Sequence, residues 1–559
     1  MRYYEFPCGC KFPIQETILS DGRPSIKFDA NISKLPMDCE RTWDLISEGN
    51  TKGVFQLESR SGQSFAKKLK PRNIEHLSAL VAIIRPGCLE AMRDGKNITE
   101  HYIARKNGDE PVTLFHPALE SALAPTYGEM IYQEQAMQIA RDIAGFDLQQ
   151  ADVLRKAIGK KKAKLMAEVK EQFLTGAATM SIVNKDQAEE IFGWIEKSQR
   201  YSFNKSHSVS YAINAYLSAY AKAHFPKAFF TSYLYYAQEK QKPLKEVNEL
   251  ANNAKTFDIE ILTPSIAQGN QHFKLVGNDI YVGISDIKGL GKSVVTRMKK
   301  LQTTLEERFN KPLVEFDWLE ILIFMGLNIN SSAMKALISV GAFSHLSESR
   351  TQMLHELEAY ASLSNRERTW CESYMVTLMF KDSNNSNFTH MLLMLTDAKT
   401  GKMGGCANKN RLEKVKGIYQ NVKEPPYSME DSAAWIAMTE EKYLGLSITC
   451  AVVESCDISA ANCTCKEFLQ GYHNQTNSYL IAATIDESRE IKTKRGKTPG
   501  QLMAFLVASD ITGNLDGVVA FPDVWAEYKR LLAEGNTVML CGERGTEQTS
   551  LLLKKVYQI

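Results

Sequence analysis

Apolar residues recur three and four positions apart through 49–247, for example in EQAMQIARDIAGF and NAYLSAYAKAHF. This spacing puts them on one side of an α-helix, which is the pattern of helices that pack around a shared core. Residues 1–48 differ, because short extended stretches and a turn, DGRP, precede the amphipathic segment ERTWDLISEG. The pattern predicts a leader or linker over 1–48 and a large all-helical domain over 49–247.

Three further ranges follow, and each has its own pattern. Over 248–364 short helical segments surround glycines, as in DIKGLGKSVVTRMKK, which predicts a small helical module. Over 365–477 polar stretches such as KDSNNSNF separate brief apolar runs, as is typical of linkers and insertions. Over 478–559 apolar runs alternate with turn residues, as in SYLIAATIDE and NTVMLCGE, and predict a small antiparallel barrel. The expected fold class is multidomain α+β.

Composition narrows the class of protein. The chain has 67 Lys and Arg against 65 Asp and Glu, so any surface for nucleic acid must be a local patch. No apolar run approaches the ~20 residues of a membrane span. The 11 cysteines are an odd number scattered along the chain, which indicates reduced thiols. We expect a cytoplasmic location and no membrane partner.

Basic residues are concentrated in LRKAIGKKKAKLMAEVK, where six cations fall within ten positions: Arg155, Lys156, Lys160, Lys161, Lys162 and Lys164. Binding a triphosphate or a DNA backbone needs clustered cations, and Arg adds a planar, bidentate geometry that Lys lacks. An isolated run of charge is more often a solvated helix face. Taken alone, this segment leaves both interpretations open.

Five motifs occur in a fixed order: GVFQLES at Gly53–Ser59, IRPG at Ile84–Gly87, YGEMIYQEQ at Tyr127–Gln135, LRKAIGKKK at Leu154–Lys162 and FNKSHS at Phe203–Ser208. In this order and spacing they resemble the fingers domain of the C-family replicative polymerases, the bacterial DNA polymerase III alpha subunits. The resemblance implies a DNA replication protein whose fingers domain grips primer-template DNA and the incoming deoxynucleoside triphosphate (dNTP). It covers most of this chain but only the C-terminal half of the family's architecture.

The resemblance places dNTP or phosphate contacts on Arg85, Arg155, Lys156, Lys160, Asn204, Lys205, Ser206 and His207. The family sets a basic pair against the triphosphate, and here its second member is Lys156 where Arg is usual. Arg85 could instead form a structural salt bridge, and Ser206 could cap a helix beside a surface His207. Gln133 and Gln135 lie two apart on a helix, so at most one of them contacts substrate.

The segment IKGLGKS resembles the hairpin of a helix-hairpin-helix module, in which glycines let backbone N–H groups approach a phosphate at a helix N-terminus. A G-x-G pattern alone is more often a tight turn. The downstream segment NINSSAMKALISVGAFSHL resembles the family's second hairpin unit, so we predict a tandem module over 248–364. The implied DNA contacts are Lys288, Gly289, Gly291 and Lys292, together with Lys161 and Lys162 of the basic segment.

The C-terminal range resembles the OB-fold of the same family, from KTKRGKTPG onward. The resemblance implies a barrel whose basic hairpin tip contacts DNA through Lys494, Arg495 and Lys497. Phe505 is the available stacking aromatic, and we expect it to lie in the core. GQLMAF also resembles a peptide that docks on a sliding clamp. Strand alternation explains it equally well, so a clamp partner is a side hypothesis.

Two groups of cysteines could in principle bind zinc. Cys8 and Cys10 form one group, and the other contains Cys450, Cys456, Cys463 and Cys465 with His473 nearby. The spacing of the second group is irregular beside the paired C-x₂₋₄-C motifs of structural zinc sites. We therefore expect ordinary buried thiols and no metal ligand in this chain.

The chain contains no D-x-D pair, whereas the family holds two catalytic metal ions with such a pair and a third Asp in its palm domain. We do not assign Asp29 of KFD to catalysis and expect no catalytic residue here. The resemblance then implies a split DNA-directed DNA polymerase, inactive as an isolated chain, with Mg²⁺ held by a separate palm and PHP polypeptide. Such a split suggests a bacteriophage origin. The alternative is a non-catalytic, DNA-binding replication accessory protein.

Overall fold

The computed structural model describes residues 2–18, 24–26, 35–160, 163–198, 200–266, 268–326, 328–379, 387–396, 405–472, 477–493, 499–545 and 549–559. For a few of these, Lys160 among them, only the backbone is described. The chain divides into two compact units, Met1–Phe229 and Phe230–Ile559.

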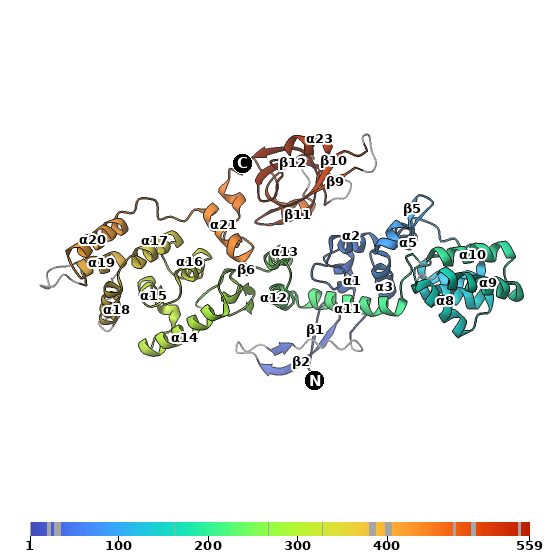
Figure 1. Cartoon of the computed structure of the whole chain (residues 1–559), viewed down its shortest axis with the longest axis horizontal. Helices are drawn as coiled ribbons and strands as arrows, with labels where there is room; N and C mark the ends of the chain where they lie inside the picture. The colour runs from blue at the N-terminus through green and yellow to red at the C-terminus, as the bar shows by residue number, and fades with distance from the viewer. Residues whose placement is uncertain are drawn as a thin grey trace. The chain divides into compact units, whose positions relative to one another are not determined.

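The first unit begins with a small antiparallel sheet and continues as helices (Figure 1). The sheet has the strand order β1-β2-β3, with β1 at Arg2–Glu5, β2 at Lys11–Ile18 and β3 at Pro24–Ile26. A short ribbon of β4 (Met92–Arg93) and β5 (Lys96–Asn97) interrupts the helices. The helices are α1 (Glu40–Ser47), α2 (Arg60–Leu69), α3 (Ile74–Ile83), α4 (Pro86–Glu90), α5 (Ile98–Asn107), α6 (Glu120–Leu123), α7 (Gln133–Ala144), α8 (Leu148–Lys160), α9 (Ala163–Met180), α10 (Lys185–Ser198) and α11 (Lys205–His224).

The long helix α11 lies against α1 and α3 (Figure 1). Ala212, Ala215 and Ala219 are fully buried on its inner face, and such small side chains let neighbouring helices approach closely. The Trp43 and Tyr216 rings pack with their centroids 4.7 Å apart. Helix α11 is therefore the scaffold on which the first helices of this unit are assembled.

Helices α7 to α10 form a second packed group with its own apolar core. The rings of Phe146, Phe173 and Phe192 lie at its centre, with centroids 6.2 Å apart for the first two and 5.3 Å apart for the last two. A Cβ atom at Gly176 would lie 2.1 Å from the Ala144 carbonyl oxygen. Only glycine allows α9 to approach α7 this closely.

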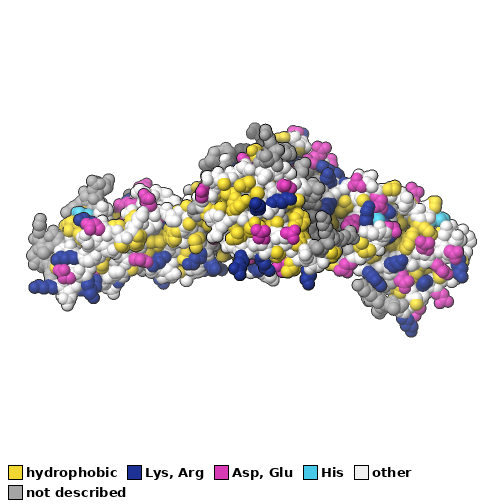
Figure 2. All heavy atoms as spheres, turned by 90° about the horizontal axis from the view of Figure 1, so that it is seen from above, with side chains coloured by type: hydrophobic (Ala, Val, Ile, Leu, Met, Phe, Trp, Pro, Cys, Tyr) yellow, Lys and Arg dark blue, Asp and Glu magenta, His cyan; other side chains and the backbone are white. Residues whose placement is uncertain are grey.

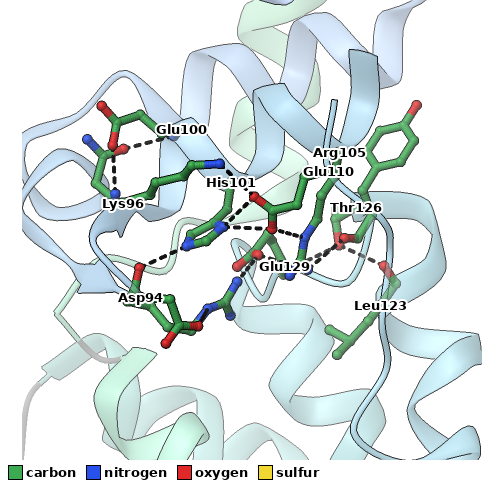
Figure 3. A network of polar contacts seen from close by, with 12 residues as sticks. Asp94, Lys96, Glu100, His101, Arg105, Glu110, Leu123, Thr126 and Glu129 are labelled. Atoms are coloured by element: carbon green, nitrogen blue, oxygen red, sulfur yellow. Dashed lines mark hydrogen bonds and ion pairs between the residues drawn. The ribbon is translucent and has the colours of Figure 1, made fainter. Parts of the chain in front are cut away.

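A buried polar network joins α5 to the β4–β5 ribbon and to the segment before α7 (Figure 3). The Glu129 carboxylate accepts from Arg93 and from Arg105, the latter at 3.0 Å. Glu110 accepts from His101 Nδ1 at 2.8 Å and from Arg105 Nε at 2.8 Å. Burial raises the pKa of Glu110, but hydrogen bonds from its basic partners outweigh burial and lower this pKa to about 2.

The second unit combines helices, a small sheet and a barrel (Figure 1). Its small sheet has the order β6-β8-β7, with β6 at Ile261–Leu262, β7 at Lys274–Val276 and β8 at Asp279–Tyr281. The helices up to residue 361 are α12 (Pro226–Ala237), which begins in the first unit, α13 (Pro243–Lys255), α14 (Lys292–Phe309), α15 (Trp318–Met325), α16 (Ser331–Ser339) and α17 (Arg350–Ala361).

The range 365–477 is more regular than its polar sequence predicts. It contains α18 (Asn365–Met379), α19 (Phe388–Thr396), α20 (Lys409–Lys423), α21 (Ala433–Leu444) and α22 (Cys465–Leu469). Two buried carboxylates join these helices to each other and to α17. Glu440 accepts from Arg350 at 2.8 Å, and Glu367 accepts from Arg411 Nε at 2.9 Å. Ion pairs hold these helices, and the helices bury few apolar residues. Their sequences therefore lack the continuous apolar stripe by which a helix is usually predicted.

The chain ends in a closed five-stranded barrel of order β10-β11-β13-β12-β9. Its elements are β9 (Tyr479–Lys492), β10 (Leu502–Asp510), β11 (Gly513–Ala520), α23 (Pro522–Tyr528), β12 (Thr537–Arg544) and β13 (Leu551–Gln558). Ala504, Leu506 and Ala508 of β10 point inward and are buried. The helical domain and the terminal barrel are both present, so the predicted multidomain α+β class is confirmed.

Phe505 was predicted to be a core residue, and this is wrong. Its neighbours Ala504 and Leu506 fill the barrel, and strand alternation turns Phe505 outward with 41% of its surface exposed. It pairs in register with Arg489 of β9 and Val519 of β11. The apolar run LMAFLVASD does not say which of its two alternating sets faces the core, and the register of the barrel decides it.

The surface carries both signs of charge. Figure 2 shows Lys and Arg side chains among Asp and Glu across the face in view, without one large region of a single sign. This agrees with a formal net charge of only +2. In the described part of the chain, no helix has the length and apolar character needed to cross a bilayer.

We expect Glu110→Gln to destabilise the first unit by about 1–3 kcal/mol at pH 7, the magnitude for hydrogen bonds to a charged group. The folded pKa of about 2 lies below the ordinary value of 4.5, so this contribution is present above pH 4.5 and is lost as the pH falls toward 2. Thermal unfolding followed by circular dichroism at pH 7 and pH 3.5 measures it. Glu171→Gln, on the exposed face of α9, is the control. A difference between Glu110→Gln and the parent chain that does not shrink at pH 3.5 would contradict the assignment.

Candidate nucleotide and nucleic-acid interface

The start of α11 is fixed by the carboxylate of Glu134, which lies in the first turn of α7. Asn204 Nδ2 donates to Glu134 Oε1 at 2.9 Å, and the backbone N–H of Lys205 donates to Glu134 Oε2 at 2.9 Å. The side-chain oxygen of Asn204 also accepts from the His207 N–H at 2.8 Å, so Asn204 caps the helix. Its predicted nucleotide contact is therefore secondary to a structural role.

The backbone joins α7 and α11 at the same place. The Phe203 N–H donates to the Ile131 oxygen at 2.8 Å, and the Phe203 oxygen accepts from the Gln133 N–H at 3.0 Å. The buried Gln135 side chain accepts from the Ile131 N–H at 2.9 Å and donates to Thr126 Oγ1 at 2.6 Å. Gln135 is a structural residue, so only Gln133 is left as a candidate for substrate contact.

Four aromatic side chains and one guanidinium form a continuous series of ring contacts. The Arg85 guanidinium lies 4.5 Å from the Phe203 ring centroid. Centroids are 5.5 Å apart between Phe203 and His207, 4.0 Å between His207 and Tyr211, and 5.1 Å between Tyr211 and Phe55. We call Phe55, Phe203, His207 and Tyr211 the aromatic row. His207 and Tyr211 are four apart and share one face of α11, and Phe203 lies just before the helix N-cap, where its backbone pairs with the segment before α7.

Two cations lie beside the aromatic row. Arg85 has a buried Nε atom, and no described residue accepts a hydrogen bond from it. No carboxylate among the described residues pairs with Arg85, so the salt-bridge interpretation finds no support there. Lys205 is exposed, with Nζ 5.7 Å from the Tyr132 ring centroid, and Ser206 next to it is exposed. Contacts with aromatic rings orient the Arg85 guanidinium and the Lys205 ammonium group, and both groups could bind an anion.

Arg155 and Lys156 lie on α8 and share one carboxylate. Arg155 donates to Asp152 Oδ1 through Nε at 2.9 Å and Nη2 at 2.8 Å, and Lys156 Nζ lies 2.7 Å from Asp152 Oδ2. Hydrogen bonds from Lys156 and Arg155 lower the pKa of the exposed Asp152. Contacts of the described residues do not join this pair to the aromatic row. The Lys160 side chain, Lys161 and Lys162 lie outside what the structure describes.

Sequence reasoning missed three members of the aromatic row: Phe55, Phe203 and Tyr211. The spacing of four between His207 and Tyr211 was a usable signal, because aromatic side chains four apart on a helix are neighbours. Phe55 carried no such signal. It lies 156 positions before Tyr211 in sequence (211 − 55), and only the packing of the helices brings the two rings together.

The predicted hairpin at IKGLGKS precedes α14 as expected. Ile287 and Leu290 are buried and anchor the turn, whereas Lys288, Gly289, Gly291 and Lys292 are exposed. Gly289 has a φ of +96°, a conformation that side-chain-bearing residues rarely adopt. Gly291 is the N-cap of α14, and a Cβ atom there would meet nothing within 4 Å. Open space therefore borders the N-cap of α14, where a phosphate could approach the helix N-terminus.

An open groove separates this hairpin from the start of α13. Three lysines line it, namely Lys242, Lys245 and Lys288, together with buried or partly buried Leu244, Ile287 and Leu290. Lys245 also pairs with Glu487. Sequence analysis found Lys288 but missed Lys242 and Lys245, which precede the hairpin by more than 40 residues. The hairpin and α13 together make a basic groove on a nearly neutral chain.

The candidate contacts of the barrel are only partly described. Lys494, Arg495 and Lys497 lie outside the described residues. The exposed Phe505 pairs in register with the exposed Arg489 on the outer face of the barrel. An aromatic ring beside a guanidinium suits a stacked base and its phosphate, so Phe505 returns as a candidate contact.

The possible metal ligands that converge among the described residues are not the oxygen ligands that Mg²⁺ prefers. Mg²⁺ takes oxygen ligands, principally carboxylates. The convergent group of possible metal ligands found among the described residues consists of three cysteines and one histidine: Cys8, Cys10, Cys39 and His224. The cysteines at 450, 456, 463 and 465 do not meet in such a group within the same part of the chain, and His473 is outside it. Asp29 is also outside the described residues.

Two family models match the chain. The model of the bacterial DNA polymerase III alpha subunit finger domain matches residues 16–181, and that of the helix-hairpin-helix motif matches residues 258–353. The resemblance inferred from the fingers motifs and the hairpin is thereby confirmed. The fingers match begins before position 49, where the sequence pattern placed the start of this domain.

Similar proteins extend this match along almost the whole chain. The DNA polymerase III subunit alpha of Aquifex aeolicus is 32% identical over 95% of this chain, that of Halalkalibacterium halodurans is 29% identical over 97%, and that of Staphylococcus aureus is 27% identical over 96%. The chain spans only 40% to 44% of the length of these relatives. The chain is therefore similar to a part of the bacterial DNA polymerase III alpha subunits, and it matches the model of their finger domain and that of a helix-hairpin-helix motif.

Proposed function

We propose that the chain is a component of a replicative DNA-directed DNA polymerase and binds the incoming dNTP at the start of α11. The observation that carries this proposal is the aromatic row, which ends at Arg85 with its unsatisfied, buried Nε. A nucleotide has a flat base and an anionic triphosphate. A partly exposed row of rings beside oriented cations offers a partner to each of these parts.

In this proposal the positions of the cations decide their roles. Arg85 is held by the Phe203 ring and presents a planar fork to a phosphate oxygen. Lys205 extends from a helix start whose backbone is fixed by Glu134, so only its flexible side chain has to be ordered. Arg155 and Lys156 would exchange Asp152 for phosphate, because an exposed ion pair is worth only about 0–1 kcal/mol. These interactions position and neutralise the triphosphate.

We propose that the second unit holds primer-template DNA without reading its sequence. The groove between the hairpin and α13 combines three lysines with the N-terminus of α14, and both features attract a phosphate backbone. The strand order of the barrel, with β11 and β13 parallel, supports its interpretation as an OB-fold. Its face around Phe505 would then take single-stranded template. Contact with a sliding clamp through 500–505 is a lesser possibility, since Met503, Ala504 and Leu506 are buried.

We further propose that the catalytic Mg²⁺ is held by a palm domain on a partner polypeptide. The absence of any D-x-D in the sequence and of a convergent group of carboxylates among the described residues supports this. Within such a complex the present chain would supply positioning and electrostatic stabilisation. If the chain is instead a non-catalytic accessory protein, only the DNA-binding role of the groove would apply to it.

Primer extension with magnesium and all four dNTPs is expected only when the purified chain is mixed with a palm-bearing partner. The partner alone and the chain alone are the controls. Extension by the chain alone would overturn the split-enzyme proposal. Inactivity of the mixture, with DNA binding retained, would favour the accessory protein.

In that complex we expect Arg85→Ala to reduce the extension rate about 10²–10³-fold, the magnitude for one preorganised donor in a transition state. Arg85→Lys should recover little, because Lys cannot reproduce the planar fork that stacks on Phe203. A dNTP titration of single-nucleotide incorporation measures the effect. The control is Arg141→Ala, an exposed arginine in the last turn of α7. Equal rates for Arg85→Ala and Arg141→Ala would exclude Arg85 from the site.

Removing Lys242 and Lys288 together is expected to weaken binding to duplex DNA of any sequence. The slope of log affinity against log salt should fall by about 0.9 for each phosphate that the variant no longer neutralises. Fluorescence anisotropy between 50 and 200 mM salt, about the range where such interactions are resolved, is a suitable measurement. Lys300→Ala, exposed further along α14, is the matched control. An unchanged slope for the double variant would show that DNA does not use this groove.

A further inference from the structure

Four side chains from three distant parts of the first unit converge on one point. Cys8 and Cys10 belong to the turn between β1 and β2, Cys39 directly precedes α1, and His224 is the last residue of α11. Their ligand atoms all lie within 4.8 Å of one another. Cys39 Sγ is 3.3 Å from His224 Nε2, and Cys8 Sγ is 4.0 Å from the same nitrogen.

The turn that carries the first two cysteines is tightly built. The Phe6 N–H donates to the Cys10 oxygen at 2.9 Å, and the Gly9 N–H donates to the Phe6 oxygen at 2.8 Å. Gly9 has a φ of +81°, which a residue with a side chain would adopt only with strain. Hydrogen bonds within residues 6–10 therefore make this a rigid turn, and the turn carries both thiols.

Aromatic side chains hold the histidine in place. The Tyr220 ring lies one turn back along α11, with its centroid 4.3 Å from that of His224, and the Phe6 ring meets His224 edge-on at 4.9 Å. His224, Cys10 and Cys39 are buried, whereas Cys8 is exposed. The imidazole is thus oriented with Nε2 toward the cysteine sulfurs, and one side of the group remains open to the solvent.

We propose that Cys8, Cys10, Cys39 and His224 bind one zinc ion in a structural site of the Cys₃His class. Tetrahedral zinc, with Zn–S bonds of about 2.3 Å, places its ligand atoms roughly 3.5–3.8 Å apart. The Cys39–His224 separation of 3.3 Å would lengthen slightly and the Cys8–His224 separation of 4.0 Å would shorten slightly to reach this range. Three thiols and an imidazole form a complete ligand set with no position left for a water. A disulfide would use two of the thiols and leave the third cysteine and the histidine unexplained.

The ion would join the β1–β2 hairpin to the start of α1 and to the end of α11. Cys39 fixes the start of α1, and His224 fixes the end of α11, the helix whose first turn carries the candidate nucleotide contacts. The ligands are up to 216 residues apart, so one ion would close a very long loop in the chain. This proposal does not depend on the polymerase assignment.

The test is metal analysis of the intact chain, purified under reducing conditions without chelators, incubated with zinc and then desalted. Inductively coupled plasma mass spectrometry should find about one zinc per chain. Cys39→Ser and His224→Ala should lose it, while Cys450→Ser, a cysteine outside the group, should keep it. The conservative variant His224→Cys, which restores a fourth ligand, should also retain zinc.

Cobalt provides a readout that does not depend on a variant folding. When Co²⁺ replaces zinc in the unaltered chain, thiolate-to-cobalt charge transfer and the visible bands of tetrahedral cobalt are expected. Absence of these bands, or a chain without stoichiometric zinc, would overturn the proposal. So would zinc that persists in Cys39→Ser but disappears in Cys450→Ser, because that places the ion at the other cysteine group.

Discussion

The candidate nucleotide site depends on one carboxylate. Glu134 accepts from the Asn204 side chain and from the Lys205 backbone, and so it ties the first turn of α7 to the first turn of α11. A negative group at a helix N-terminus is stabilised by the unpaired N–H groups and the helix dipole. Lys205, Ser206 and His207 follow in this first turn of α11, and their side chains are exposed.

Helix α11 carries this constraint through the first unit. Its 20 residues span about 30 Å, and its inner face of small side chains lets α1 and α3 pack against it. The aromatic row lies at one end, and the cysteine-histidine group lies at the other. Contacts at both ends therefore hold α11 in a fixed position. The chain has almost no net charge, and this helix places the cation Lys205 at a defined point beside the aromatic row.

The coarse fold could be predicted because it rests on local patterns. Helical spacing predicted the large helical domain and alternation predicted the barrel, since each pattern is complete within about ten residues. The range 365–477 failed this reasoning because its helices are joined by buried pairs such as Arg411 with Glu367. Phe505 failed because alternation gives two possible faces, and only the closed register of the barrel chooses between them.

The sequence by itself determined the chemistry that is available: the ordered fingers motifs, the glycine hairpin and the clustered cations. The tertiary structure decided which of these groups meet. It placed Phe55 on Tyr211 and brought Cys39 to His224 across 185 residues. The physical reason is that side-chain contacts act over a few ångströms. Groups distant along the chain interact only after the packing of whole helices has set their positions.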